Sequence, residues 1–282
     1  MCPRDLDVHL EVRCAKITHE VDPFELLELH LEQSGATVVE RAPVWGLAGQ
    51  GGQLLVHRPI DGGQAATLAR AEKDGELVYF VFAHTTVNGF AERAEALRDA
   101  VRSFRLLHPK GGLAEPLLPG GARMPIDHGF LYPASFRLDA DKTSNAALAG
   151  YELEHKQLAG RGGIIVVVVI ARREAEHEDP HVVGALAQRA LHKRGIELPA
   201  LDLVEVTPLD RRLPTHAASG AGRYRGAQVE TELVIARDPQ AWVVLARATP
   251  SREINGPAWV AGRRAFAIVR ERFATSHASQ DS

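Results

Sequence analysis

The chain has 282 residues, 45 % hydrophobic and 24 % charged, so it holds enough apolar material for one large soluble domain or two ordinary ones. A formal net charge of −3, with no basic run interleaved with aromatic residues, excludes a strongly basic nucleic-acid binder. The most apolar run, GGIIVVVVIA, is too short to cross a bilayer, so we expect no membrane span. Its Val and Ile content predicts a buried strand instead.

Two cysteines, Cys2 and Cys14, provide neither a disulfide framework nor a zinc cluster. We expect Cys14 to lie mid-strand as a small core residue. The N-terminus lacks the basic-then-apolar pattern of a signal peptide, which favours the cytoplasm. A Cys directly after Met also fits a mature lipoprotein whose signal was removed, and that alternative would place the protein in the cell envelope.

Residues 1–108 are expected to form a first domain. It begins with VHLEVRCAKITHEVDPFELLELHLEQSGATVVER, which predicts a strand, a turn, an Asp-Pro pair, a helix, a glycine and a strand. It ends with an apolar strand and an amphipathic helix. The apolar stripe of that helix comprises Phe90, Ala94, Leu97, Val101, Phe104 and Leu107.

Residues 109–127 are dense in Pro and Gly and show neither a helical nor a strand period, so we predict an inter-domain linker there. Residues 128–275 are expected to form a second domain, and residues 276–282 a tail. The second domain repeats the order of the first, including a final helix whose stripe comprises Trp259, Gly262, Ala265, Phe266 and Val269.

The repeat predicts an α+β fold: in each domain a mostly antiparallel sheet with two helices, which we expect to cover one side. The second domain opens with HGFLYPASFRLDADKTSNAALAGYELEHKQ, read as two strands and a loop. The first domain has no counterpart to this opening hairpin. We therefore expect an exposed sheet edge there, which needs protection in a monomer or a strand from a partner.

The stretch EHEDPH (Glu176 to His181) could be a metal site, because its histidines flank a helix start. Its counterpart in the first domain is THEVDPF, which has Phe24 where this stretch has His181. Helix capping by Asp22 and Asp179, each followed by proline at the first helical position, is therefore the favoured interpretation. We expect no metal and no bound cofactor.

Two glycine-rich stretches, GLAGQGGQ (Gly46 to Gln53) and SGAGRYRG (Ser219 to Gly226), precede strand patterns rather than helices, so they do not predict phosphate-binding loops. We interpret both as hairpin or surface loops at corresponding places in the two repeats. Loops of this kind often carry binding residues. The candidate binding residues are Trp45, Arg223, Tyr224 and Arg225. No G-x-S-x-G pattern occurs, and the histidines outside EHEDPH show no H-E-x-x-H pattern, so no catalytic residues are assigned.

The second half resembles the PsbP-like superfamily, which includes the photosystem subunit PsbP and a Ran-binding import factor. The resemblance rests on the opening GFLYPASFRL and on the C-terminal RRAFAIVRERF, with RDAVRSFRLL as the matching helix of the first half. It implies binding domains, mostly non-enzymatic. In one bacterial branch, the Eag class of type VI secretion chaperones, two such domains clasp an apolar helix of an effector.

These observations favour a non-catalytic protein-binding module, acting as chaperone, adaptor or scaffold, whose partner could be an apolar helix lying on an open sheet face. ELVYFVFA and QVETELVIA show an alternation that permits such a face. One alternative is an envelope lipoprotein or accessory subunit, which rests on Cys2. The other is a metal-binding protein or enzyme centred on His177, Glu178 and His181. The oligomeric state stays open.

Overall fold

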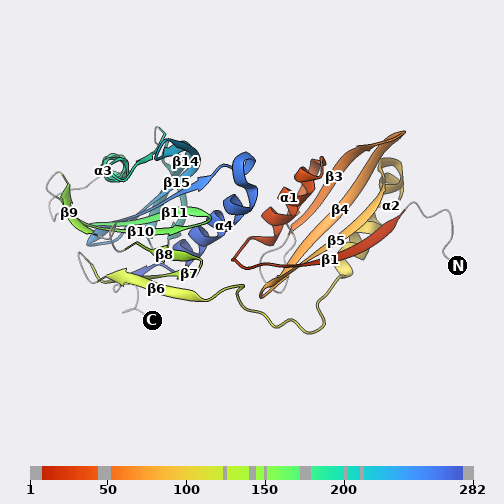
Figure 1. Cartoon of the computed structure of the whole chain (residues 1–282), viewed down its shortest axis with the longest axis horizontal. Coiled ribbons are helices and arrows are strands. Elements are labelled where there is room, and N and C mark those ends of the chain that lie inside the picture. The colour runs from red at the N-terminus through yellow and green to blue at the C-terminus, as the bar shows by residue number, and fades with distance from the viewer. Residues whose placement is uncertain are drawn as a thin grey trace. The chain divides into compact units, whose positions relative to one another are not determined.

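The computed structural model describes residues 8–43, 52–122, 126–139, 144–148, 151–171, 179–199, 202–209 and 213–275. The chain divides into two compact units, Met1–Glu115 and Pro116–Ser282, each described by itself below (Figure 1). Both are α+β with antiparallel strand pairing, as predicted.

The first unit is a five-stranded sheet with the order β1-β5-β4-β3-β2. Its elements are β1 (His9–Lys16), α1 (Pro23–Gln33), β2 (Thr37–Pro43), β3 (Gly52–Ile60), β4 (Gly63–Asp74), β5 (Leu77–Thr86) and α2 (Val87–Ser103). The chain passes from one edge strand, β1, through α1 to the other edge strand, β2, and then returns strand by strand to β5 beside β1.

The second unit has a nine-stranded sheet, whose main path is β12-β14-β15-β16-β11-β10-β8, with β13 paired to β14 and β9 to β10. A separate three-stranded sheet has the order β17-β7-β6. The elements are β6 (Leu117–Ala122), β7 (His128–Pro133), β8 (Phe136–Leu138), β9 (Ser144–Leu148), β10 (Tyr151–Gly160), β11 (Gly163–Ala171), α3 (Pro180–His192), β12 (Ile196–Glu197), β13 (Val204–Leu209), β14 (Leu213–Tyr224), β15 (Ala227–Arg237), β16 (Ala241–Pro250), α4 (Arg252–Glu271) and β17 (Ala274–Thr275).

The strand order of the first unit recurs in the second. In the second unit neighbouring strands follow the order β11-β16-β15-β14-β13. This order corresponds, strand for strand, to β1-β5-β4-β3-β2 in the first unit. The difference lies beside the first strand. In the second unit β10 pairs antiparallel with β11, whereas β1 has only β5 as a partner among the described residues.

The two helices of each unit lie on opposite faces of the sheet, which corrects the expectation that they cover one side. In the first unit Phe90, Leu97 and Val101 of α2 pack with Val81 and Ala83 of β5. The intervening residues of β5 point to the other face, where the α1 side chain His30 stacks on Phe80 with 5.9 Å between ring centroids.

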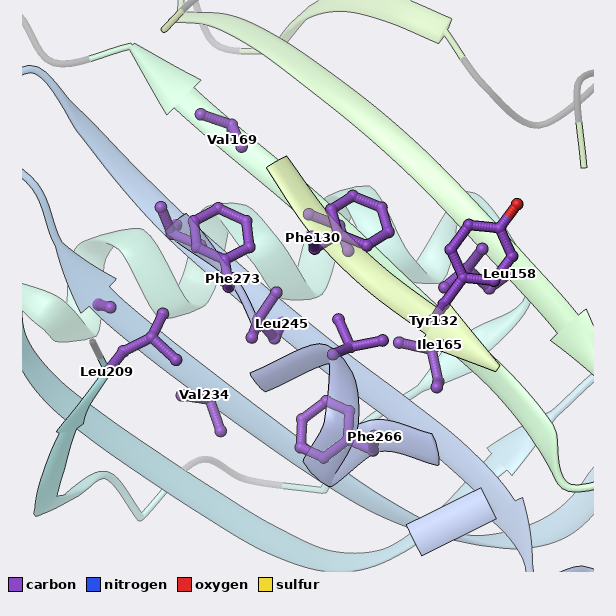
Figure 2. Close-up of a cluster of buried hydrophobic side chains, with 14 of the residues drawn as sticks. Phe130, Tyr132, Leu158, Ile165, Val169, Leu209, Val234, Leu245, Phe266 and Phe273 are labelled. Carbon is purple, nitrogen blue, oxygen red and sulfur yellow. The ribbon is translucent and has the colours of Figure 1, made fainter. Parts of the chain in front are cut away.

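In the second unit, α4 and strand β7 cover one face. Phe266 and Phe273 come from the C-terminal end, Phe130 and Tyr132 from β7, and they meet the strand residues of one buried cluster (Figure 2). On the other face α3 packs through Val183, Ala187 and Leu191. The apolar stripe predicted for α4 is therefore the face that packs against the sheet.

The segment predicted as linker contains a strand, β6, which pairs with β7. The sequence LLPGGA does not predict a strand, because Pro and Gly are rare in strands. Among the described residues β6 pairs with β7 alone, and an edge strand of this kind tolerates Pro119. Gly120 is required by close packing, since a Cβ there would lie 2.5 Å from the Phe130 ring. The opening of the second unit likewise contains more strands than the two expected: β7, β8, β9 and β10.

The predicted helix starts are confirmed. The Asp22 carboxylate accepts hydrogen bonds from the backbone N–H groups of Phe24 and Glu25 at 2.8 and 3.0 Å. Asp179 accepts one from the N–H of His181 at 2.9 Å. Pro23 and Pro180 are the first helical residues, as expected from their fixed φ.

The helical stripe of the first unit is shorter than predicted. Helix α2 ends at Ser103, so the last two expected members, Phe104 and Leu107, lie beyond it. Leu107 is exposed, while Phe104 still packs against the α2-side core.

Candidate functional site

Three of the four candidate binding residues lie in the described part of the chain, at the end of strand β14 and in the turn that follows it. Trp45 lies outside the described residues, in the segment that joins β2 to β3. Arg225 and Gly226 form the turn between β14 and β15, and residues 219–224 belong to strand β14 rather than to a loop. Since β14 and β15 correspond to β3 and β4, the two glycine-rich stretches do not occupy corresponding places, contrary to expectation.

The β14–β15 turn has a local structural role. Arg225 and Gly226 both have positive φ, 49° and 84°, the combination that a type I′ hairpin turn requires. The Arg225 guanidinium lies over the Tyr224 ring, 5.2 Å from its centroid, and the Arg225 N–H donates to the carbonyl of Gly195 at 2.8 Å. Arg223 lines an adjacent open hollow of about 660 Å³, which does not include Tyr224 or Arg225.

The EHEDPH stretch is only partly within the described residues, since Glu176, His177 and Glu178 lie outside them. Asp179 caps helix α3 as described above. Among the described residues no group of three or more His, Cys, Asp or Glu side chains is placed to hold a metal ion.

The face expected to receive an apolar helix is covered. In ELVYFVFA, Phe80 and Phe82 are buried on the α1 side and Val81 on the α2 side. In QVETELVIA, Leu233 and Val234 are buried on opposite faces of the second sheet. These strands therefore present no open aliphatic face.

Exposed aliphatic residues lie instead on the edge strand β1. Leu10 and Val12 are 56 % and 54 % exposed, and Cys14 is exposed too, not a core residue as predicted. All three side chains share the α2 face of the sheet, because Leu10 pairs with Ala83 and Val12 with Val81.

At the same residues the backbone N–H and C=O groups of β1 have no strand partner in the part of the chain that the structure describes. The N–H of Ile17 donates to the carbonyl of Glu76, the residue opposite it, at 2.8 Å. In an antiparallel pair the hydrogen-bonded residues alternate, so His9, Glu11, Arg13 and Ala15 direct their N–H and C=O groups toward β5. Leu10, Val12 and Cys14 therefore direct theirs away from the sheet.

The opposite face of β1 carries charge. The Arg13 guanidinium donates to both carboxylate oxygens of Glu11, at 2.7 and 3.0 Å, and lies 5.4 Å from the centroid of the Phe82 ring. The hydrogen bond from Arg13 lowers the pKa of Glu11. The edge thus presents an apolar row on one face and an ion pair on the other.

A Thr-His-Glu arrangement on this face resembles a catalytic triad. Thr67 Oγ1 and His84 Nδ1 lie 2.9 Å apart, and His84 Nε2 lies 3.6 Å from the Glu11 carboxylate. Burial lowers the pKa of His84, and the carboxylate of Glu11 offsets this only in part. Thr67 lies in the middle of β4, which is paired on both sides, so the neighbouring backbone amides are engaged in the sheet and cannot form an oxyanion hole.

A second polar cluster lies in the second unit. Arg247 donates to Glu230 at 2.6 Å and to Glu232 at 2.8 Å, and the indole N–H of Trp259 donates to Glu230 at 2.6 Å. Burial acts to raise the pKa of Glu230, but the hydrogen bonds from Arg247 and Trp259 outweigh it and lower that pKa. These bonds connect helix α4 to strands β15 and β16, so the cluster has a structural role.

Comparisons with known proteins assign no family. No protein-family model matches the chain, and no curated protein matches it. None of the helices in the described residues combines the length and the hydropathy that a bilayer-spanning helix requires.

Three solved structures illustrate the weak matches. The immunity protein TplEi of the type VI secretion system of Pseudomonas aeruginosa has 15 % identity, a TM-score of 0.27, and alignment over 96 % of this chain and 92 % of its own. LpqN, involved in cell envelope biogenesis of Mycobacterium tuberculosis, has 11 % identity and a TM-score of 0.31, and its alignment covers 57 % of this chain and 92 % of its own. The chain matched in the Tle4-Tli4 complex has 14 % identity and a TM-score of 0.24, and the alignment covers 94 % of this chain and 93 % of that chain. Similarities this weak establish neither a family nor a function.

The sequence indicated part of this site. The missing hairpin predicted an open edge in the first unit, and HLEVRCAK already shows apolar and charged residues alternating, as in a strand with two different faces. The exposure of Cys14 could not be predicted in the same way. It depends on whether helix α2 covers that part of the sheet face, and the sequence around Cys14 contains no signal for the position of α2.

Proposed function

We propose that the protein is a non-catalytic protein-binding module that acts by pairing a partner strand with β1. The observation that carries this proposal is the open edge itself: eight residues of regular strand, unpaired on one side among the described residues, with Leu10 and Val12 exposed. An edge of this kind is a template for strand addition, in which backbone hydrogen bonds give affinity and alternate side chains give specificity.

We further propose that the two units are PsbP-like domains that arose by tandem duplication. Their shared strand order supports this. In the second unit the position beside β11 is filled within the chain by β10. In the first unit the equivalent position beside β1 would be filled by a strand of the partner.

The covered sheet faces favour a strand over an apolar helix as the bound element, because a helix needs an open apolar groove. Two finer roles are proposed. One is a chaperone or adaptor for a secreted effector, acting in the cytoplasm. The other is an accessory subunit in the cell envelope. The identity of the bound protein decides between them.

The test is a quantitative capture from the native host with two matched baits. Val12→Lys places a charge on the open edge at β1, and Val39→Lys places one on the other edge strand, β2; both valines are 54 % exposed. We expect the wild-type and Val39→Lys baits to retain the same bound protein. We expect Val12→Lys to lose at least about nine-tenths of it, because a charged side chain on an edge strand opposes strand pairing.

Hydrogen exchange of the captured complex provides the second readout. The amides of Leu10, Val12 and Cys14, which point away from β5, should be protected in the complex and exchange freely in the isolated monomer. A bound protein that is retained equally by both baits, with these amides unprotected, would overturn the proposed function.

A further inference from the structure

The two edges of the first sheet differ in how well they are protected. Strand β2 has a register shift between Val38 and Glu40, ends at Pro43, and is held by Arg98 of α2, which donates to Glu40 at 3.1 and 2.7 Å. Bulges and prolines are the usual devices that prevent edge-to-edge pairing. Strand β1 pairs with β5 through eight consecutive residue pairs without a shift and contains no proline.

The edges of the large sheet in the second unit are also poor templates in the described part of the chain. Strands β12, β8 and β9 have two, three and five residues, and β13 has a register shift between Val206 and Leu209. Of the sheet edges that the structure describes, strand β1 is therefore the long, regular one that lacks such protection.

We infer that the strand which pairs with β1 is β1 of a second copy of this chain, in an antiparallel arrangement with Val12 opposite Val12. This inference rests on the proposed function, because it names the partner of the same edge. The two five-stranded sheets would then form one continuous sheet across a two-fold axis.

The backbone geometry fits this arrangement. A symmetric antiparallel pair needs N–H and C=O groups that point outward from residues opposite one another. With Val12 on the axis, Leu10 lies opposite Cys14 of the second copy. These are the three residues whose backbone groups point away from β5.

The side chains fit it as well. On the α2 face, Leu10, Val12 and Cys14 of both copies would form one apolar row beside Val81 and Ala83 of each core. This row would bury the exposed surface of Leu10 and Val12. Burial of apolar side chains is the dominant favourable term in association.

On the other face, Glu11 would lie opposite Arg13 of the second copy, and Arg13 opposite Glu11. Opposite charges in directly facing positions stabilise a strand pair, and like charges destabilise it. If the second strand shifts by two residues in one direction, Arg13 lies opposite Arg13 of the second copy. If it shifts by two residues in the other direction, Glu11 lies opposite Glu11 of the second copy. Charge therefore selects the register centred on Val12 over these neighbours.

The first experiment measures the mass in solution by sedimentation over a range of concentrations. We expect the wild-type chain and Val39→Lys to approach twice the chain mass of 30.6 kDa. Val12→Lys places two ammonium groups against each other on the axis, and we expect it to weaken dimerisation by at least about 100-fold, since like charges are opposed and apolar contact is lost. Circular dichroism of both variants checks that the fold is retained.

The second experiment tests the register with charges. Glu11→Arg and Arg13→Glu each create facing like charges and should weaken the dimer about tenfold. The double variant restores both the ion pair within the chain and the facing pairs between copies, so it should return to within about threefold of wild type.

The third experiment tests the register by cross-linking. Facing residues on the axis have Cα atoms about 5.5 Å apart, within the range of a disulfide. Val12→Cys in a Cys2→Ser, Cys14→Ser background should oxidise to a covalent dimer. Native Cys14 in a Cys2→Ser background should not, because Cys14 would face Leu10 and lie about 13 Å along the strand from its own copy.

The outcomes separate this inference from the proposed function. A wild-type chain that stays monomeric at all concentrations, or a dimer that Val12→Lys leaves intact, overturns the second copy as partner. If a different protein is still lost from the Val12→Lys bait and kept by the Val39→Lys bait, the proposed function stands without it. If neither a second copy nor another protein depends on Val12, both are overturned.

Discussion

Arg247 lies in the second unit with its guanidinium group almost fully buried, and its side chain is 1 % exposed. We expect Arg247→Met to lower the free energy of unfolding by roughly 2–4 kcal/mol, because it leaves Glu230 and Glu232 side by side without the cation that both contact. The lower end allows for the partial exposure of the two carboxylates. Urea denaturation gives the value.

Arg264→Met is the matched control. Arg264 also pairs with a carboxylate, at 3.1 Å to Glu271, but the partner is about half exposed. A pair of this kind contributes less than about 1 kcal/mol. Equal losses for the two variants would contradict the role assigned to the buried guanidinium.

His84 predicts how the stability of the first unit depends on pH. Burial lowers its pKa in the folded chain, so in the acid range the unfolded chain binds a proton that the folded chain resists. The contribution of neutral His84 to the free energy of unfolding is therefore complete above the ordinary histidine pKa of about 6.5. This contribution is lost as the pH falls below that value. His84→Gln should flatten the decline between about pH 7 and 5.

The measurement equilibrates the chain in urea at each pH and then labels exposed amides with deuterium at one fixed pH. Peptides from β5 report the first unit. Glu11 has a lowered pKa as well, but its contribution is lost in a more acidic range, below about 4.3, so the two groups can be distinguished. An unchanged pH profile in His84→Gln would show that another group controls the decline.

At the scale of elements, helix α4 contacts the β10–β11 turn through two glycines. A Cβ on Gly262 would lie 2.1 Å from the carbonyl oxygen of Gly162, and a Cβ on Gly162 would lie 2.6 Å from the Gly262 nitrogen. Helix propensity alone favours alanine over glycine by about 1 kcal/mol. We expect Gly262→Ala to destabilise by roughly 1–3 kcal/mol instead, because the clash is with backbone.

Gly63→Ala provides the comparison, since a Cβ at Gly63 meets nothing within 4 Å. Thermal unfolding of the two variants and the wild type decides the point. If Gly262→Ala raised the melting temperature, the close approach of α4 to the turn would be wrong.

Helix starts could be predicted from the sequence because the cap is local. Asp22 and Asp179 each bond to amides within three residues, so neighbouring letters contain the signal. The buried stripe of α4 was predictable too, since its period is local.

The elements that were predicted wrongly depend on contacts distant in sequence. Strand β6 exists because β7 pairs with it, and residues 219–224 are strand because β14 pairs with β15 along its length. Cys14 follows the pattern of a core strand but is exposed, because it lies on an edge strand. Periodicity indicates that a strand has two faces but not which neighbours cover them.

At the scale of the whole molecule, the boundary between the units falls at Glu115, inside the Pro/Gly-rich segment. Asp74 binds the backbone of Lys110 at 2.9 Å, and the N–H of Glu20 donates to Glu115 at 2.9 Å, so the chain leading to the boundary is attached to the first unit. The segment up to the boundary therefore belongs to the first unit together with the core of that unit.

Separate cores predict separate responses to core substitutions. Leu27 of α1 is fully buried in the first unit, and Leu27→Ala should cost about 2–5 kcal/mol through lost contacts and a cavity. Hydrogen exchange by mass spectrometry should show lost protection in peptides of residues 8–115 only. Phe266→Ala, in the core drawn in Figure 2, should give the reverse pattern, with the loss in residues 116–275. If either variant exposed both units equally, the two cores would unfold as one cooperative structure, and the chain would have to be treated as a single folding unit.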